Sequence, residues 1–79
     1  MDKKEIEKKV KETLADRLDI DLEKIKLESR LVEDLGMDSF GAVELGFELK
    51  EKFSTEIPPE DMVNIRSVKD IVEYIHKKG

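Results

Sequence analysis

The residues best suited to chemistry are a serine and the aspartate before it, near the middle of the chain. Asp38 precedes a run with helical spacing, so it is predicted to cap a helix whose first position is Ser39. A serine at such a position is exposed, and the free N–H groups and the dipole of the helix favour an attached phosphate. Gly36 permits a tight backbone approach just before it. The pair therefore indicates either a simple helix cap or a serine that is modified.

Two other kinds of site fail on residue type. Ser39 and His76 could be drawn into a hydrolase triad, but no nucleophile elbow surrounds the serine and the histidine lies among lysines near the chain end. The segment that begins at Asp19 starts like a calcium-binding EF-hand loop. Its sixth position is Lys24 where glycine is needed, and its twelfth is Arg30 where a bidentate glutamate is needed. We therefore expect neither a hydrolase triad at Ser39 nor a resident calcium ion in this loop.

Composition excludes further classes of protein. The 79 residues include no cysteine, which leaves no disulfide framework and no cysteine-based metal cluster. No apolar stretch is long enough for a membrane span or a signal peptide, so a cytoplasmic location is expected. The net charge of −5 argues against nucleic-acid binding.

The whole of that net charge lies in one quarter of the chain. Residues 31–49 contain five acids and no base, and the segments on either side are each balanced. Such a run is either a solvated face or a negative patch that attracts a basic partner. Its members are Glu33, Asp34, Asp38, Glu44 and Glu48.

Apolar spacing and capping residues predict the elements that position Asp38 and Ser39. A first helix near 3–18 is followed by a long loop over 19–37, which six apolar residues would hold to the core. The second helix should run from Ser39 to about 53, a short one over 59–63, and a last one from the cap at Ser67. The predicted fold is all-α: one domain over 1–79, a small four-helix bundle with three main helices and one short helix.

The second predicted helix carries two apolar faces, of which only one is needed for packing on the core. One face suffices to seat it on a core, yet a second ridge of Phe40, Val43 and Phe47 recurs at spacings of three and four residues. Glutamates flank this ridge. Either the long loop folds over it, or it is a docking surface for a partner with an apolar slot and a basic rim.

These features together resemble the carrier-site signature of acyl carrier proteins. The resemblance lies in the run Leu31-Val32-Glu33-Asp34-Leu35-Gly36-Met37-Asp38-Ser39-Phe40, then Val43-Glu44-Leu45. It continues through Phe53, Glu56-Ile57-Pro58 and Ile65 to Val68 and Tyr74-Ile75, so it covers nearly the whole chain. That family is a four-helix bundle whose signature serine bears 4′-phosphopantetheine.

The resemblance implies a role for each group of residues. Ser39 would receive the arm from a phosphopantetheinyl transferase, with Asp38 helping to bind the transferase's metal, and acyl chains would be carried as thioesters on the arm's thiol. The surface recognised by acyl-transferring and acyl-elongating enzymes with basic docking surfaces would comprise Phe40, Val43, Glu44, Phe47, Glu48 and Met62. The acyl cavity would be lined by Leu31, Gly46, Leu49, Ile57, Met62 and Ile65. The chain would be a monomeric carrier and not a catalyst.

Several residues depart from the family pattern. Phe40 stands where leucine is usual, Gly46 replaces a larger residue and would widen the cavity, and Lys50 and Lys52 interrupt the acidic face. We therefore hypothesise a specialised carrier in fatty acid synthesis or a related lipid or polyketide pathway. A peptidyl or D-alanyl carrier remains an alternative, as does an interaction module whose Ser39 stays unmodified.

Overall fold

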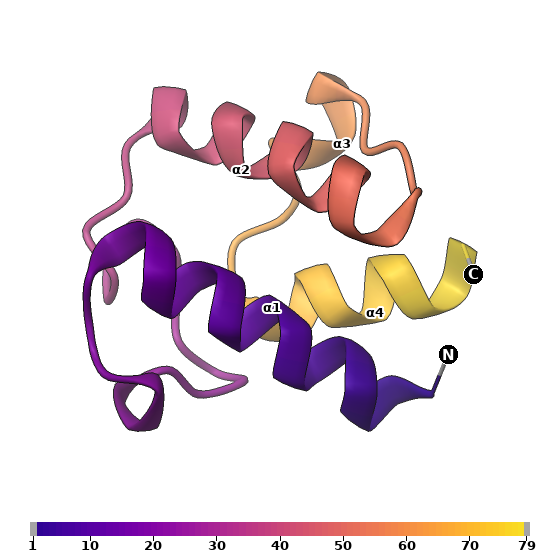
Figure 1. Ribbon diagram of the computed structural model, residues 1–79. Helices are drawn as coiled ribbons and strands as arrows, with labels where there is room; N and C mark the ends of the chain where they lie inside the picture. Colours follow the sequence, from indigo (N-terminus) through magenta and orange to yellow (C-terminus); the bar gives the residue numbers. More distant parts are fainter. Residues whose placement is uncertain (1, 79) are drawn as a thin grey trace.

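The computed structural model describes residues 2–78, and in this part of the chain it is helical without a β-strand. Three longer helices and one single-turn helix confirm the predicted all-α bundle (Figure 1). The elements in chain order are α1 (Lys3–Leu18), the 3₁₀ turn η1 (Leu22–Lys24), α2 (Ser39–Phe53), α3 (Pro59–Met62) and α4 (Val68–Lys78). No described helix has the length and apolar character that a membrane crossing requires.

Side-chain hydrogen bonds cap the starts of α1 and α4. At the start of α1 the Asp2 carboxylate accepts a hydrogen bond from the Glu5 N–H at 2.9 Å. Before α4 the Ser67 Oγ accepts from the Asp70 N–H at 3.3 Å, and an Asp70 oxygen accepts from the Ser67 N–H at 3.1 Å. This reciprocal arrangement satisfies N–H groups that the first turn of a helix leaves without a partner. The single cap at α1 and the reciprocal caps at α4 explain why both helices begin where the sequence predicts.

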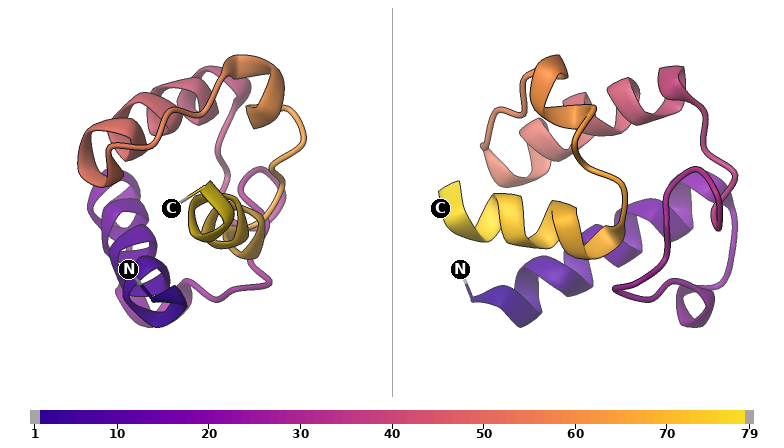
Figure 2. Two further views of the ribbon diagram at one scale, coloured as in Figure 1. Left: turned by 90° about the vertical axis from the view of Figure 1, so that its right-hand side faces the viewer. Right: turned by 180° about the vertical axis from the view of Figure 1, so that it is seen from behind.

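One hydrophobic core joins the three longer helices. α4 lies beside α1, and in the view of Figure 1 α2 passes above α4, so one face of α4 is covered and the other faces solvent (Figure 2). The apolar faces of the helices point inward, as their spacing predicts. The apolar side chains that these helices bury most deeply are Ile6, Val10 and Leu14 of α1, Leu45 and Leu49 of α2, and Val68, Ile71 and Val72 of α4.

The long loop before α2 is held down by its apolar residues and by backbone hydrogen bonds. Ile25 and Leu31 are buried, and Ile20, Leu27 and Leu35 pack partly against the core. Leu22 is the exception among the six predicted, since it is 43% exposed. The Leu31 N–H donates to the Arg66 carbonyl at 2.8 Å, which ties the loop to the residues before α4. These contacts therefore fix the position of Asp38, which directly follows the loop.

The single turn α3 is fastened to α4 by one side-chain hydrogen bond. Tyr74 donates its hydroxyl proton to Asp61 Oδ2 at 2.6 Å. That hydrogen bond, together with burial and the negative charge of Asp61, raises the pKa of Tyr74 to about 12. Pro59 opens α3 at a position where its missing N–H costs nothing.

Candidate functional site

Asp38 and Ser39 lie at the exposed start of α2. Asp38 caps the helix, with its Oδ1 accepting from the Gly41 N–H at 2.7 Å. Ser39 is the first helical residue, is exposed, and has no side-chain hydrogen-bond partner among residues 2–78. No carbonyl in that part of the chain accepts from the N–H groups of Ser39 and Phe40. A reachable hydroxyl thus stands beside two free donors and the positive end of a helix, which suits an attached phosphate.

Two glycines shape the backbone around this cap. Gly36 adopts a left-handed conformation with φ of 73°, which a larger residue would strain. A Cβ on Gly41 would lie 3.1 Å from both Asp38 Oδ1 and Met37 Cγ. The absence of a side chain at position 41 therefore lets the capping carboxylate and the buried Met37 approach the helix closely.

An apolar cavity of about 410 Å³ opens next to Ser39. It lies between the first turns of α2 and the turn α3, with the end of the long loop as a further wall. Its polar lining comes from Ser39, Glu33 and Arg66. The remaining lining is apolar, from Leu31, Val32, Ala42, Val43, Pro59, Met62, Val63 and Ile65. A hydrocarbon chain tethered at Ser39 would find an apolar volume beside its attachment point.

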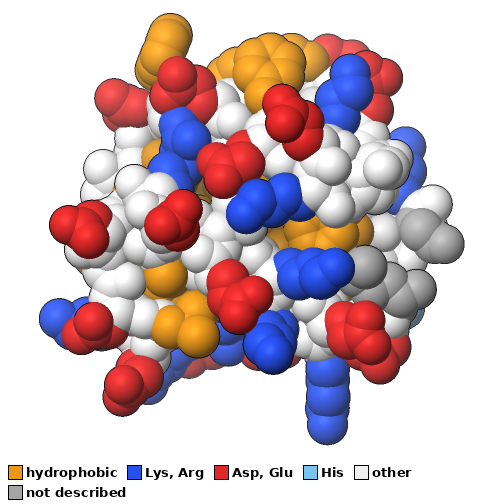
Figure 3. Space-filling model, viewed as in Figure 1, with side chains coloured by type: hydrophobic (Ala, Val, Ile, Leu, Met, Phe, Trp, Pro, Cys, Tyr) orange, Lys and Arg blue, Asp and Glu red, His pale blue; other side chains and the backbone are white. Residues whose placement is uncertain are grey.

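The second apolar ridge of α2 is exposed. Phe40 and Phe47 are 73% and 63% exposed, and Val43 between them is 39% exposed. The long loop does not fold over them, so the alternative of a covered ridge is wrong. In the space-filling view hydrophobic side chains gather at the upper edge over α2, while acidic and basic side chains mix across the face below (Figure 3). Large apolar side chains exposed to water over one helix are typical of an interaction surface.

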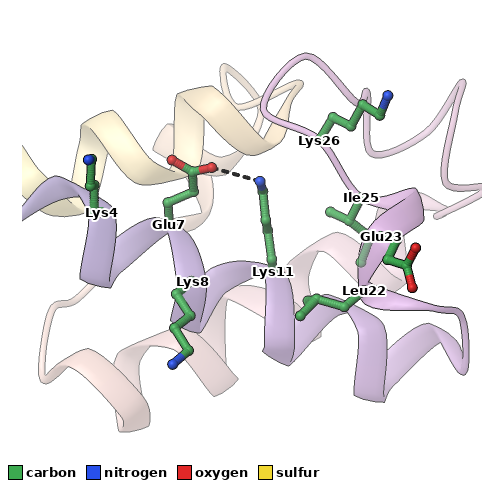
Figure 4. Close-up of a pocket in the computed structure, with 8 residues that line it drawn as sticks. All are labelled: Lys4, Glu7, Lys8, Lys11, Leu22, Glu23, Ile25 and Lys26. Carbon is green, nitrogen blue, oxygen red and sulfur yellow. Dashed lines mark hydrogen bonds and ion pairs between the residues drawn. The ribbon is translucent and has the colours of Figure 1, made fainter.

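A second pocket, of about 600 Å³, lies between α1 and η1, away from the start of α2 (Figure 4). Its floor is formed by Leu22 and Ile25, and its rim carries several lysines. One of these, Lys11, is paired with Glu7 at 2.7 Å. None of the site residues predicted from the sequence lines this pocket.

Comparison with known proteins settles the family. The family described as "Phosphopantetheine attachment site" matches residues 8–75. The acyl carrier protein of Bdellovibrio bacteriovorus is 40% identical over 74 residues, covering 94% of this chain and 95% of the relative. That of Helicobacter hepaticus is 48% identical over 66 residues, covering 84% and 87%. The structure of the acyl carrier protein from Enterococcus faecalis superposes with a TM-score of 0.84 at 30% identity, covering 100% of both chains.

The chain belongs to the acyl carrier protein family. The resemblance stated from the signature around Ser39 is confirmed, and so is the helical bundle that it implied. Phosphopantetheine is the cofactor of this family, and the residues at the start of α2 fit it: an exposed hydroxyl, free N–H groups and an adjoining apolar cavity.

The residues predicted to line the acyl cavity of this carrier divide into two groups. Leu31, Met62 and Ile65 line the cavity beside Ser39. The other three, Gly46, Leu49 and Ile57, lie in the core but do not line it. Gly46 does not widen the cavity, because Met62 packs over it: a Cβ there would meet Met62 Cγ and Sδ at 3.4 Å.

The residues predicted to contact partners of the carrier also fall into two groups, one exposed and one buried. Phe40, Val43 and Phe47 are exposed, as are the Glu44 side chain at 50% and, to a lesser extent, Glu48 at 30%. Met62 is buried at 6% exposure because it fills the space above Gly46, so it does not contribute to the surface. The exposed neighbour of α3 is instead Val63, at 72%.

The carboxylates of the acidic run over residues 31–49 already have hydrogen-bond partners within the chain, which the sequence does not reveal. Each of the five carboxylates accepts a hydrogen bond from within the chain, three from arginine side chains and two from backbone N–H groups. The pairs are Glu33 with Arg30 at 3.2 Å, Glu44 and Glu48 with Arg17 at 2.6 and 3.2 Å, Asp34 with the Arg30 N–H at 2.8 Å, and Asp38 with the Gly41 N–H at 2.7 Å.

Sequence reasoning missed Arg17, Gly41 and Val63. Arg17 stands in α1, and its partners lie 27 and 31 residues further along the chain, so no local spacing indicates the contact. For Gly41 a signal exists, because a glycine in the first turn of a helix is costly unless something approaches it closely. Val63 is an exposed valine beside a short helix and carries no pattern of its own.

Proposed function

We propose that Ser39 is the residue that carries 4′-phosphopantetheine in this acyl carrier. A carrier of this family needs a serine that a transferase can reach and that can hold a phosphodiester. Ser39 is exposed at the start of a 15-residue helix whose first N–H groups are free to face the phosphate. The arm, when attached, supplies the thiol on which acyl chains are carried as thioesters.

The single observation that carries the assignment is the position of Ser39 in the wall of the apolar cavity. Leu31, Met62 and Ile65 offer hydrocarbon contact within that cavity. An acyl chain attached through Ser39 would have apolar surface beside it. Moving that chain from water onto the apolar surface is favourable by about 0.8 kcal/mol for each CH₂ group buried. The chain's own part is to hold, shield and present the acyl group, which is the work of a carrier and not of a catalyst.

The partners proposed for this carrier follow from the surface around Ser39. A phosphopantetheinyl transferase would approach the start of α2, where Asp38 would help to bind the transferase's metal. Acyl-transferring and acyl-elongating enzymes would dock on Phe40, Val43 and Phe47, with the flanking Glu44 and Glu48 facing their basic residues. Residues 1–79 would act as one monomeric domain in the cytoplasm, in fatty acid synthesis or a related specialised pathway.

The test is to express the chain with a phosphopantetheinyl transferase and to measure its intact mass. The wild type should gain the mass of one phosphopantetheine group, and Ser39→Ala should gain none. Ser29→Ala is the matched control, since Ser29 also lies near a turn start and its hydroxyl accepts only from the Lys26 N–H. No gain in the wild type would favour an unmodified interaction module, and a gain that survives Ser39→Ala would place the arm elsewhere.

The cargo class is a separate question. Mass spectrometry of the thioester isolated from the native cell would identify it. A fatty acyl or related chain is expected, whereas an aminoacyl group would establish a peptidyl or D-alanyl carrier. If general fatty acid synthase enzymes elongated chains on this carrier as fast as on the main carrier of the host, the specialised role would be refuted.

A further inference from the structure

Arg17 of α1 reaches across to α2 and engages two carboxylates at once. Its Nη2 donates to Glu44 Oε1 at 2.6 Å and its Nη1 to Glu48 Oε1 at 3.2 Å. The arginine side chain is 24% exposed, so it is partly shielded from water and held by both glutamates. An arginine in such a fork makes stronger, more directional hydrogen bonds than a single surface pair.

The other cation near these glutamates is Lys52, whose Nζ lies 3.9 Å from Glu48 Oε2. The group formed by Glu44, Glu48, Arg17 and Lys52 is therefore electrically balanced. Beside it stand Phe40 and Phe47, which are far more exposed than any other aromatic side chain described in the structure. The surface that the sequence presents as acidic is, in three dimensions, an apolar ridge next to neutralised carboxylates.

We propose that Arg17 occupies the position beside Glu44 and Glu48 that a basic residue of a partner would otherwise take. The proposal rests on the docking role given above to this face of α2. A partner lysine or arginine that approaches either glutamate meets a carboxylate whose charge Arg17 already partly neutralises, so the partner's residue gains less from the contact than it would from a free carboxylate. Arg17 thus lowers the electrostatic part of docking and leaves the apolar ridge to supply most of the binding energy.

The kind of partner that fits this surface follows directly. It presents an apolar slot for Phe40 and Phe47, and the contact of its basic residues with the middle of α2 supplies only a small part of its affinity. A docking surface rich in lysine or arginine gains little from Glu44 and Glu48 while Arg17 holds them. Arg17 is therefore a specificity-determining residue that reduces the advantage of a strongly basic partner over a less basic one.

The test measures docking without loading. The unmodified chain is titrated by calorimetry with a phosphopantetheinyl transferase in the absence of coenzyme A, at about 50 and 300 mM salt. Arg17→Gln should lower the Kd about threefold at low salt, the order expected for a partly exposed pair, and the gain should shrink at high salt. Adding Glu44→Gln and Glu48→Gln to Arg17→Gln should abolish the gain.

The matched control is Lys3→Gln, which removes the same unit of charge from α1. Lys3 pairs with Glu73 of α4 at 3.7 Å, away from the ridge. The Kd of the Lys3→Gln variant for the transferase should therefore stay within a factor of about 1.5 of the wild-type value. An equal gain for Lys3→Gln, an unchanged or higher Kd for Arg17→Gln, or no binding by either wild type or Arg17→Gln would overturn the proposal. Circular dichroism confirms that each variant is folded. Because coenzyme A is absent, a chain that docks but gains no mass in the loading assay would refute only the assignment of Ser39.

Discussion

Replacing Gly46 by alanine should stabilise the bundle, and the structure sets the size of the effect. Gly46 is buried in the interior of α2, where alanine is better than glycine by about 0.8–1.0 kcal/mol. The added Cβ would lie 3.4 Å from Met62 Cγ and Sδ and 4.0 Å from the Ile57 carbonyl, which are ordinary contact distances. Burying the new methyl group adds up to about 0.8 kcal/mol.

The two contributions together give a gain of about 1–2 kcal/mol in the free energy of unfolding. For a domain of this size each kcal/mol raises the melting temperature by about 4–8 °C, so a rise of roughly 4–16 °C is expected. Differential scanning calorimetry measures it, and urea titration with an unchanged m-value checks that the unfolding transition is of the same kind.

Gly41→Ala is the matched control, because it makes the same change in the same helix. There the Cβ would lie 3.1 Å from Asp38 Oδ1 and Met37 Cγ, so the cap or the buried methionine must shift. Losing part of an N-cap costs about 0.5–2 kcal/mol, which offsets the gain in helix propensity. If Gly41→Ala stabilised the protein as much as Gly46→Ala, or if Gly46→Ala destabilised it, the contact distances would not decide the outcome and the reasoning would fail.

Three further changes test other contacts. Tyr74→Phe should cost about 1 kcal/mol at neutral pH by removing the hydrogen bond to Asp61. Since the Tyr74 pKa is raised from 10.0 to about 12, this contribution is full below pH 10 and is lost between pH 10 and 12. The free energies of unfolding of the wild type and Tyr74→Phe, measured by urea titration, should therefore converge across that range. A constant difference between them would contradict the argument. Asp38→Ala should cost about 1 kcal/mol through the lost cap, seen as a lower melting temperature. Leu49→Ala, at a fully buried position, should cost about 2–5 kcal/mol in urea unfolding, and a loss below 1 kcal/mol would mean that the core collapses around the gap.

Most of the fold could be predicted because its signals are local. The stripe of apolar residues in α1 and the caps at Asp2 and Ser67 lie within four residues of the groups they act on. The same holds for Asp38, whose capping partner is three residues away. The position of Ser39 at an exposed helix start therefore needed no knowledge of tertiary packing.

The rest could not be predicted because it depends on which helices cross and where. Arg17 meets its glutamates only because α1 and α2 approach each other at those residues. The sequence predicts Met62 both on the partner surface and in the cavity, and its side chain turns inward to the cavity because Gly46 leaves room for it. The charge of a segment can be counted from the sequence, whereas the partners of each charge are set by the packing of distant elements.

The turn α3 forms one wall of the cavity, and its stability differs from that of the bundle. A helix of four residues is too short to form by itself, since the first turn fixes several residues for few hydrogen bonds. It is held by Met62 in the core and by the bond from Tyr74 to Asp61. Its amide protons should therefore exchange with solvent through a local unfolding reaction of lower free energy than the global one. Local unfolding of this one turn would remove one wall of the cavity, while α1, α2 and α4 remain folded.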